Sequence, residues 1–246
     1  MLIEILIPVL LLIVAFLYAS VGHGGASGYI AVLTLFSISA TVYKPVVLIL
    51  NIVIAGIAFI QYYRAGYFKW NLCWPFIITS IPAAFLGSHF ANDVSSNLYN
   101  RLLGFALIFP IIRLLGIGPK EKAEHKNIFL PSALFIGAII GFISGLLNIG
   151  GGIFLSPVII LLAWSSAKEA AAVSSIFIVC NSLAGLAAGH KNGINFTQES
   201  YIWLTAAVIG GFAGAYLGSH RFKQLTVRYL LSCVLCIAAV KLIFFP

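Results

Sequence analysis

Residues 145–157 read GLLNIGGGIFLSP, so three consecutive glycines interrupt a run of otherwise apolar residues. A glycine inside a helix is about 1 kcal/mol less favourable than an alanine. The Gly150–Gly152 cluster therefore predicts that one helix ends near Asn148 and that another begins near Ile153. Residues 20–28, SVGHGGASG, form a second cluster of this kind in the first half of the chain.

The composition of the chain places both glycine clusters in a membrane. Hydrophobic residues make up 61% of the 246 residues and charged residues only 8%, with a mean hydropathy of +1.09. A soluble globular domain carries about 25% charged residues, so this chain has too little polar surface to dissolve in water. The length could supply roughly eight to ten helical spans. The net charge of +8 lies in short polar breaks beside apolar runs, which argues against nucleic-acid binding.

Ten apolar runs follow one another along the chain. They cover residues 2–21, 28–40, 45–63, 70–90, 99–117, 128–147, 152–165, 170–189, 201–220 and 226–245. A polar stretch, GPKEKAEHKN, separates the fifth run from the sixth. We therefore expect a first transmembrane repeat over residues 1–117, a cytoplasmic linker over residues 118–127 and a second transmembrane repeat over residues 128–246.

The two halves match each other at four places in a single register. The matches pair GHGG at 22–25 with NIGGG at 148–152, Asn51 with Asn181, Gly66 with Gly193, and LGSH at 86–89 with LGSH at 217–220. Because one offset explains all four, the sequence indicates an internal duplication. Internal repeats are the usual architecture of secondary transporters.

The short second run of each half leaves two topologies open. Residues 28–40 span only about half of the hydrocarbon core, so the first two runs form either one broken crossing or a hairpin that returns to its starting side. The hairpin gives one membrane face ten basic residues and the other four, whereas the single crossing divides them eight and six. The ten are Arg64, Lys69, Arg113, Lys120, Lys122, Lys126, Lys168, Arg221, Lys223 and Arg228, and the four are Lys44, Arg101, Lys191 and Lys241. Since basic residues favour the cytoplasmic side, the charges favour the hairpin.

We therefore expect an all-α polytopic membrane protein with two homologous, inverted repeats. Each repeat contains a glycine-broken helical hairpin followed by three full transmembrane helices. An odd number of crossings in each half inverts the halves and leaves both termini on the periplasmic or extracellular side. The first run lacks a basic n-region and carries Glu4, so it does not resemble a cleaved signal peptide.

The glycine breaks are the candidate substrate site. Non-helical backbone at membrane depth persists only where it is buried in protein or lines a polar cavity. The helices that begin after each break present unpaired N–H groups and a partial positive charge, which attract anions, and consecutive N–H groups can form an anion nest. Close helix packing through small residues is the alternative interpretation. The predicted substrate-binding residues are Gly22, His23, Gly24, Gly25, Ser27, Asn51, Asn148, Gly150, Gly151, Gly152 and Asn181.

The polar side chains near the breaks could serve either binding or structure. Asn51 and Asn181 lie inside apolar runs, where an unpartnered amide is costly, so each either donates to an oxyanion or makes an interhelical hydrogen bond. His23 could donate a hydrogen bond, carry a coupling proton or stabilise the break. His89 and His220 fall near helix ends, where packing explains them better than substrate binding does.

Several classes of function lack the residues that they need. All six acidic residues lie at or near the ends of apolar runs, which disfavours a cation substrate and a carboxylate proton relay. The chain has no Walker, H-E-x-x-H or G-x-S-x-G motif, so we expect no ATP hydrolysis and no enzymatic activity. Cys233 and Cys236 form C-x-x-C inside the last apolar run, where apolar packing is simpler than metal binding. We expect no metal, cofactor or catalytic residue.

Three motifs carry a family resemblance. They are V-G-x-G-G at Val21–Gly25, an asparagine in the next full span, and G-L-L-N-I-G-G-G-x-x-x-x-P at Gly145–Pro157. With these motifs the chain resembles, over essentially its whole length, the sulfite exporter TauE/SafE family of the toluene-sulfonate uptake permease group. The resemblance implies a permease of the bacterial inner membrane for sulfur-containing anions such as sulfite, sulfonates or sulfoacetate. His23 stands where other residues also occur in that family.

The main functional hypothesis is a secondary active transporter that works by alternating access around a central anion site. Its partners would be a small anion, the lipid bilayer, a coupling proton and a second copy of the chain in a homodimer. A passive anion channel or pore is an alternative, as is a non-transporting membrane subunit of an enzyme complex. A transporter saturates and shows counterflow, a channel passes current without either, and a subunit co-purifies with its enzyme.

Overall fold

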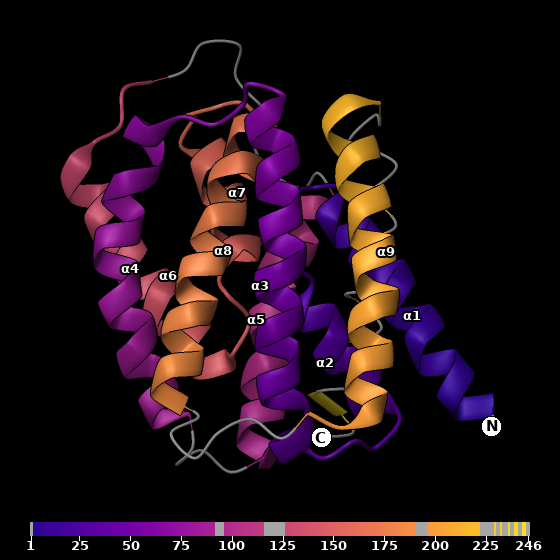
Figure 1. Cartoon of the computed structure of the whole chain (residues 1–246). Helices are drawn as coiled ribbons and strands as arrows, with labels where there is room; N and C mark the ends of the chain where they lie inside the picture. The colour runs from indigo at the N-terminus through magenta and orange to yellow at the C-terminus, as the bar shows by residue number, and fades with distance from the viewer. Residues whose placement is uncertain are drawn as a thin grey trace.

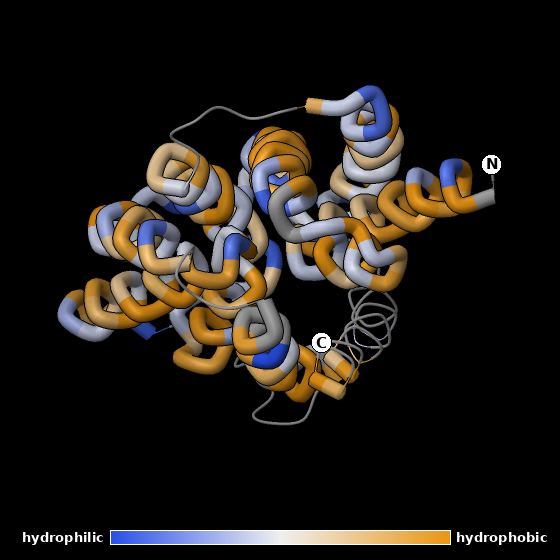
Figure 2. Tube along the Cα trace, turned by 90° about the horizontal axis from the view of Figure 1, so that it is seen from below, coloured by the Kyte–Doolittle hydropathy of each residue, from blue (hydrophilic) through white to orange (hydrophobic). Residues whose placement is uncertain are grey.

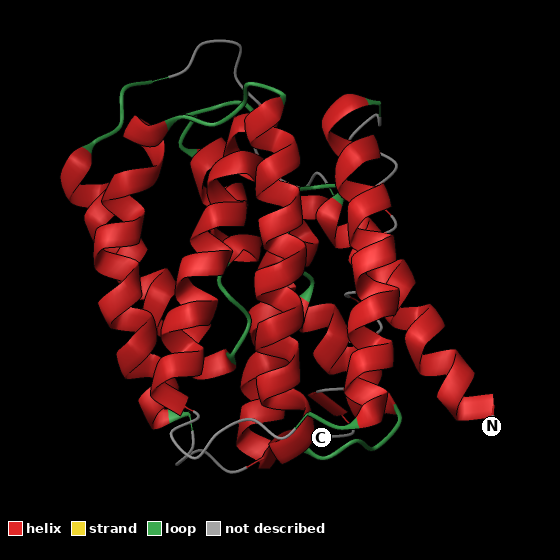
Figure 3. Cartoon of the chain, viewed as in Figure 1, coloured by secondary structure: helices red, strands yellow, loops and turns green. Residues whose placement is uncertain are grey.

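The computed structural model describes residues 2–91, 96–115, 126–189 and 196–221, with seven single positions between 229 and 244. In these residues the regular structure consists of nine continuous helices and contains no strand (Figure 1, Figure 3). The helices are α1 (Leu2–Ala19), α2 (Ala26–Leu35), α3 (Ala40–Arg64), α4 (Trp70–Phe90), α5 (Ser96–Leu114), α6 (Leu130–Leu147), α7 (Gly152–Leu161), α8 (Ala167–Gly189) and α9 (Gln198–His220).

The first nine predicted apolar runs each correspond to one of these helices. Five helices are long and apolar enough to cross a membrane, over Val42–Arg64, Trp70–Phe90, Leu130–Leu147, Ala167–Gly189 and Gln198–His220. The chain is therefore an all-helical, multi-pass membrane protein, as the sequence predicts. α5 carries the polar residues Asn97, Asn100 and Arg101 in its first two turns, and the end of the span predicted over 99–117 lies outside the described residues. The tenth run, 226–245, and the predicted linker, 118–127, lie largely outside the described residues.

The outer surface of the bundle is apolar. Large hydrophobic side chains are exposed on several helices, among them Phe105, Phe135, Ile209 and Phe212, each with more than half of its surface open. Figure 2, which looks along the bundle, shows most helical turns coloured as hydrophobic and only short stretches coloured as hydrophilic. A surface of this kind is stable against lipid chains and unstable against water.

Each half of the chain starts with a helix, a glycine break and a short helix. α2 follows α1, α7 follows α6, and each short helix has ten residues. α2 and α7 extend toward opposite ends of the bundle, and α3 and α8 run side by side in opposite directions (Figure 1). α2 packs against α3 and α7 packs against α8, so each short helix lies on the long helix that follows it.

The later helices of each half pack on the other half. α4 lies along α6 and α8, and α9 lies along α1 and α3. α3 and α8 also contact each other directly. The helices of the two predicted repeats are therefore interleaved in the core.

Rows of glycine allow two of these helix pairs to approach closely. A Cβ atom added at Gly141 in α6 would lie 2.6 Å from the Cα atom of Ser80 in α4, and one at Gly214 in α9 would overlap the backbone of Phe16 in α1. The rows are Gly137, Gly141 and Gly145 in α6, and Gly210, Gly214 and Gly218 in α9. Small residues at four-residue spacing are typical of close contacts between membrane helices.

The repeated Leu-Gly-Ser-His units belong to the same contacts. Gly87 faces the backbone of α6, and Gly218 faces the backbone of Ser20 at the end of α1. Both histidines of these units, His89 and His220, are exposed at helix ends. Nδ1 of His220 lies 3.0 Å from the carbonyl oxygen of Tyr216 and 2.8 Å from Oγ of Ser219, and it is the donor because a carbonyl oxygen only accepts. These positions agree with the packing interpretation of the units.

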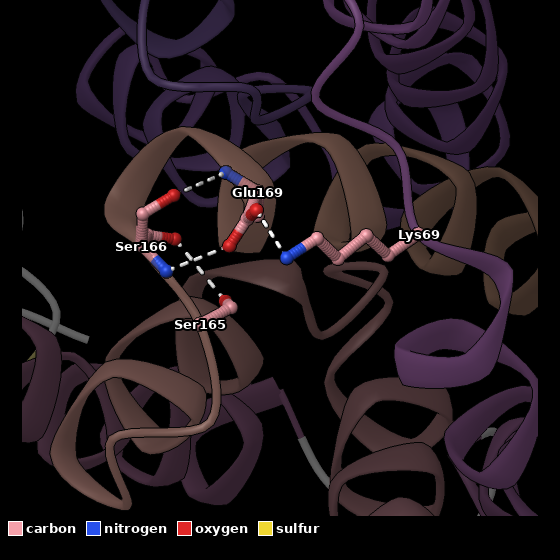
Figure 4. A network of polar contacts seen from close by, with 4 residues as sticks. All are labelled: Lys69, Ser165, Ser166 and Glu169. Carbon is pink, nitrogen blue, oxygen red and sulfur yellow. Dashed lines mark hydrogen bonds and ion pairs between the residues drawn. The ribbon is translucent and has the colours of Figure 1, made fainter. Parts of the chain in front are cut away.

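The start of α8 is fixed by a capping box and an ion pair (Figure 4). The N–H of Ser166 donates to Oε2 of Glu169 at 2.9 Å, and the N–H of Glu169 donates to Oγ of Ser166 at 3.4 Å. These two bonds satisfy N–H groups that a helix start leaves unpaired. Oε1 of Glu169 also lies 2.5 Å from Nζ of Lys69, so the loop before α4 is held to the first turn of α8.

The glycine rows generate a prediction about stability. Gly141→Ala and Gly214→Ala should each lower the free energy of unfolding by about 1–3 kcal/mol, because the new methyl group has to displace the neighbouring helix. Thermal unfolding of the purified protein in detergent would measure the change. Gly56→Ala is the matched control, since no atom lies within 4 Å of the added Cβ and the helix gains up to about 1 kcal/mol. Equal shifts in all three variants would contradict the packing role.

Candidate functional site

Both predicted breaks are present, and both lie within the helical bundle (Figure 3). The first separates Ala19 from Ala26, and the second separates Leu147 from Gly152. Five residues in the breaks adopt left-handed backbone angles, which only glycine and asparagine accept readily. They are Gly22, Gly25, Gly150, Gly151 and Asn148, with φ values of 77°, 98°, 72°, 76° and 52°.

His23 joins the first break to the second. Its Nε2 atom lies 3.1 Å from the carbonyl oxygen of Gly152 and 3.2 Å from Oγ of Ser156, both in α7. A carbonyl oxygen only accepts, so Nε2 carries the proton and donates it to Gly152. Ser156 in turn donates to Oγ of Ser174 in α8 at 2.7 Å. The histidine is 7% exposed, so this chain of hydrogen bonds lies inside the protein.

Asn51 is the second link between the breaks. Its Oδ1 atom accepts a hydrogen bond from the N–H of Ala26, the first residue of α2, at 3.3 Å. Its Nδ2 atom donates to Oγ of Ser182 in α8 at 2.9 Å. Side chains at Gly24 and Gly150 would collide with this amide, so glycine from each break makes room for it. Asn51 therefore makes the interhelical hydrogen bond that the sequence leaves as one of two options.

Asn181 occupies the matching position in the second half but behaves differently. It is 1% exposed, and neither its Oδ1 nor its Nδ2 atom has a hydrogen-bond partner among the described residues. Oγ of Ser144 in α6 is also buried and unpartnered. A buried amide without a partner costs about 1–3 kcal/mol, so these groups mark a site whose polar partner is not another part of the described chain.

The other predicted site residues line the two breaks. A side chain at Gly22 would collide with Ala171, and one at Gly152 would collide with Ile178, so both glycines permit close contact with α8. The hydroxyl of Ser27 pairs with that of Tyr18 at 2.8 Å. Asn148 ends α6 in a left-handed conformation, and its side chain is buried.

Sequence reasoning did not single out Ser174 and Ser182 in α8. They are fully buried and make the contacts with Ser156 and Asn51 described above. The signal was available, because Ser174, Asn181 and Ser182 are polar residues at seven- and eight-residue spacing inside an apolar run, which places them on one face of a helix.

The groups around the breaks are neutral hydrogen-bonding groups. The charged side chains that the structure describes lie near helix ends or in loops. Over the same part of the chain, no three His, Cys, Asp or Glu side chains gather as a metal site would require. Helix N-termini, amides and hydroxyls can all donate hydrogen bonds to an anion.

Residues 7–242 match the family model of the sulfite exporter TauE/SafE. The chain belongs to the TauE/SafE family. It is 33% identical over 235 residues to the probable membrane transporter protein y4hK of Sinorhizobium fredii, with 94% of each chain covered. It is 25% identical to the probable membrane transporter protein YdhB of Bacillus subtilis, with 92% of this chain and 93% of the relative covered. No solved structure matches the chain significantly.

Family membership confirms the resemblance that the glycine motifs predict and makes the chain a membrane transporter. The motifs that carry the resemblance are the same residues that form the two breaks. Glycine is therefore required at these motif positions for two reasons in this TauE/SafE member. Some of the glycines have left-handed backbone angles, and others contact neighbouring residues too closely to carry a side chain.

The contrast between the two asparagines generates a prediction. Asn51→Ala removes a side chain with two partners and leaves the N–H of Ala26 unpaired, whereas Asn181→Ala removes one without partners. We expect the first variant to lose about 1–3 kcal/mol more stability than the second. Thermal unfolding in detergent without added anion would compare them. Both variants remove the same atoms from a buried position, so each is the control for the other. Equal losses of unfolding free energy in the two variants would contradict the difference in hydrogen bonding.

Proposed function

We propose that this transporter moves a small anion, namely a sulfur-containing oxyanion or organosulfonate such as sulfite or sulfoacetate, by secondary active transport. The observation that carries the proposal is the meeting of the two glycine breaks inside the bundle. His23 and Asn51 of the first half reach Gly152 and Ser182 of the second half, so one central site would be shared by both halves.

An anion fits the chemistry of this site better than a cation does. The predicted site residues supply backbone N–H groups and the Asn148 and Asn181 amides, whereas the Asn51 amide and the His23 N–H already donate within the protein and would hold the site in shape. An anion in a low-dielectric interior needs donors of this kind to replace its lost water. The sulfur chemistry itself is supported by the name of the family and not by any residue described above.

Alternating access would use the two halves as inverted repeats. The antiparallel course of α3 and α8 and the opposite directions of α2 and α7 support this arrangement (Figure 1). Since α4 and α9 each pack on the other half, movement of one half would change access on both sides of the central site. Inverted repeats that rock around a fixed site are common in secondary transporters.

One end of the bundle carries the polar contacts that would close the site on that side. Nζ of Lys168 donates to the hydroxyl of Tyr67 and to the carbonyl of Ser219, both at 3.1 Å, and Lys69 pairs with Glu169. The abundance of basic residues at this end supports a cytoplasmic orientation in the bacterial inner membrane, with periplasmic termini. Opening toward this side would require these contacts to separate.

Transport assays with glycine variants test the position of the site. Gly24→Ala and Gly151→Ala should reduce uptake of radiolabelled sulfite into proteoliposomes at least about tenfold, because the added methyl group reaches the Asn51 amide or strains a left-handed residue. Gly56→Ala, in open space on α3, should keep the original rate. If folded Gly24 and Gly151 variants transport normally, the site lies elsewhere. Wild-type protein that passes anion current without saturation or counterflow would instead be a channel.

A proton on His23 would couple anion flux to pH. His23→Gln keeps an N–H donor for the Gly152 carbonyl but removes the group that can gain and lose a proton. We expect the wild-type uptake of methanesulfonate, which stays a monoanion throughout, to change as the pH is lowered from 7 toward 4, because a buried imidazole gains its proton only in acid. The variant should show a flat profile. Parallel profiles for the two proteins would remove the coupling role and leave His23 as a link between the breaks.

A further inference from the structure

We propose that the transported anion binds at one of the two breaks, the N-terminus of α7, where Ser144 and Asn181 donate hydrogen bonds to it, and that the anion carries a single charge. This inference rests on the proposed anion transport and adds the location, the contacting side chains and the charge of the ligand.

The first observation is that the two helix starts differ. At α2, the N–H of Ala26 already donates to Asn51, and the ring of Tyr18 covers the next turn at Gly28. At α7, the N–H groups of Gly152 and Ile153 donate to no acceptor in the described part of the chain. The start of α2 is therefore partly capped by the protein, although the Tyr29 hydroxyl beside Gly25 has no partner among the described residues. The start of α7 has no comparable cap in the described part of the chain.

The second observation is an unpartnered hydroxyl beside the open helix start. The Cβ atom of Ser144 lies 2.9 Å from the position that a Cβ atom would occupy on Gly151, the residue that precedes α7. Its Oγ atom is buried and has no partner among the described residues. A serine in a helix usually satisfies its hydroxyl on a carbonyl of the preceding turn, as Ser175 does with Ala172. The free Ser144 hydroxyl points to a ligand.

The third observation is the position of Asn181 on α8. Phe177 lies 3.0 Å from the side-chain position of Gly151, and Ile178 contacts the side-chain positions of Gly150 and Gly152. Residues separated by three or four positions lie on the same face of a helix. Asn181 therefore lies on the face of α8 that carries Phe177 and Ile178 and contacts the second break. Both polar atoms of its buried amide are unpartnered. Two unsatisfied side chains from different helices thus flank the open start of α7.

The charge of the ligand follows from the charge of the site. A helix N-terminus supplies the equivalent of about half an elementary positive charge. The remaining donors are neutral, and the charged side chains that the structure describes lie near helix ends or in loops. Such a site can stabilise one buried negative charge, whereas a second charge would lack compensation. Hydrogensulfite or a monosulfonate therefore fits the site better than sulfoacetate, which carries two charges.

Ligand binding to purified protein tests the charge directly. Ethanesulfonate and sulfoacetate are matched probes, because they share a two-carbon sulfonate and differ by one carboxylate. The dissociation constant of each, measured by calorimetry at constant ionic strength, should be at least about tenfold lower for ethanesulfonate. Equal affinities, or tighter binding of sulfoacetate, would overturn the single-charge assignment.

Variants test the location. Ser144→Ala and Asn181→Ala should each weaken ethanesulfonate binding at least about tenfold, since each removes a hydrogen bond to a charged group. Ser144→Ala should also leave the melting temperature of the ligand-free protein unchanged or higher, because the lost hydroxyl had no partner there. A merely structural serine would show the reverse. Ser175→Ala and Ser80→Ala, which remove satisfied buried hydroxyls on α8 and α4, should change binding less than about twofold.

A variant at the first break distinguishes the location of the site from anion transport in general. The hydroxyl of Tyr29, beside Gly25, is also buried and unpartnered, but it lies at the first break. If the anion binds at the second break, Tyr29→Phe should bind ethanesulfonate like the wild type. Loss of binding in Tyr29→Phe with normal binding in Ser144→Ala and Asn181→Ala would overturn the location but keep anion transport. If neither probe binds and neither sulfite nor methanesulfonate is transported, the proposed function and this inference both fail.

Discussion

The structure depends on one constraint, which is that backbone N–H and C=O groups left unpaired at membrane depth must find partners inside the protein. A continuous helix satisfies these groups by itself, but this chain stops being helical twice within the bundle. At the first break the protein supplies partners, since the backbone N–H of His23 donates to the carbonyl oxygen of Tyr18 and the side chain of Asn51 accepts from the N–H of Ala26. At the second break it supplies fewer partners, and the first N–H groups of α7, the Ser144 hydroxyl and the Asn181 amide have none among the described residues.

This constraint explains why so many residues between the packed helices are small. The breaks have to be enclosed by helices that come close enough to exclude lipid, and the glycine rows of α6 and α9 permit that approach on both flanks. The long helices α3 and α8 cross between the breaks and carry the polar side chains that reach them. Because each half provides helices that cover the other, neither break is enclosed by its own half alone.

The sequence predicted those features that depend on local residue type. Apolar runs and glycine clusters are local, so nine helices and both breaks could be located from them, and the motif around Gly150–Gly152 identified the family correctly. The links between segments could not be derived, because His23 and Ser156 are 133 positions apart and only the packing brings them together. The difference between Asn51 and Asn181 could not be predicted either, since the two residues occupy matching places in the predicted repeat and differ in the groups that surround them. The glycine rows at four-residue spacing were visible in the sequence but became informative only when the partner helices were known.

A neutral donor set suits a protein that must release its ligand as well as bind it. A lysine or arginine buried against the anion would contribute strong attraction, and breaking such a pair in a water-poor interior would be slow and costly. In the proposed site, hydrogen bonds from Ser144, Asn181 and a helix N-terminus to the anion would be individually weaker, and a modest movement of α6 or α8 would lengthen several of them together. Conduction through a membrane requires binding that is favourable enough for entry and weak enough for departure. Under the proposed function, the unequal breaks would meet this requirement by separating two tasks: the first would hold the halves together, and the second would exchange the ligand.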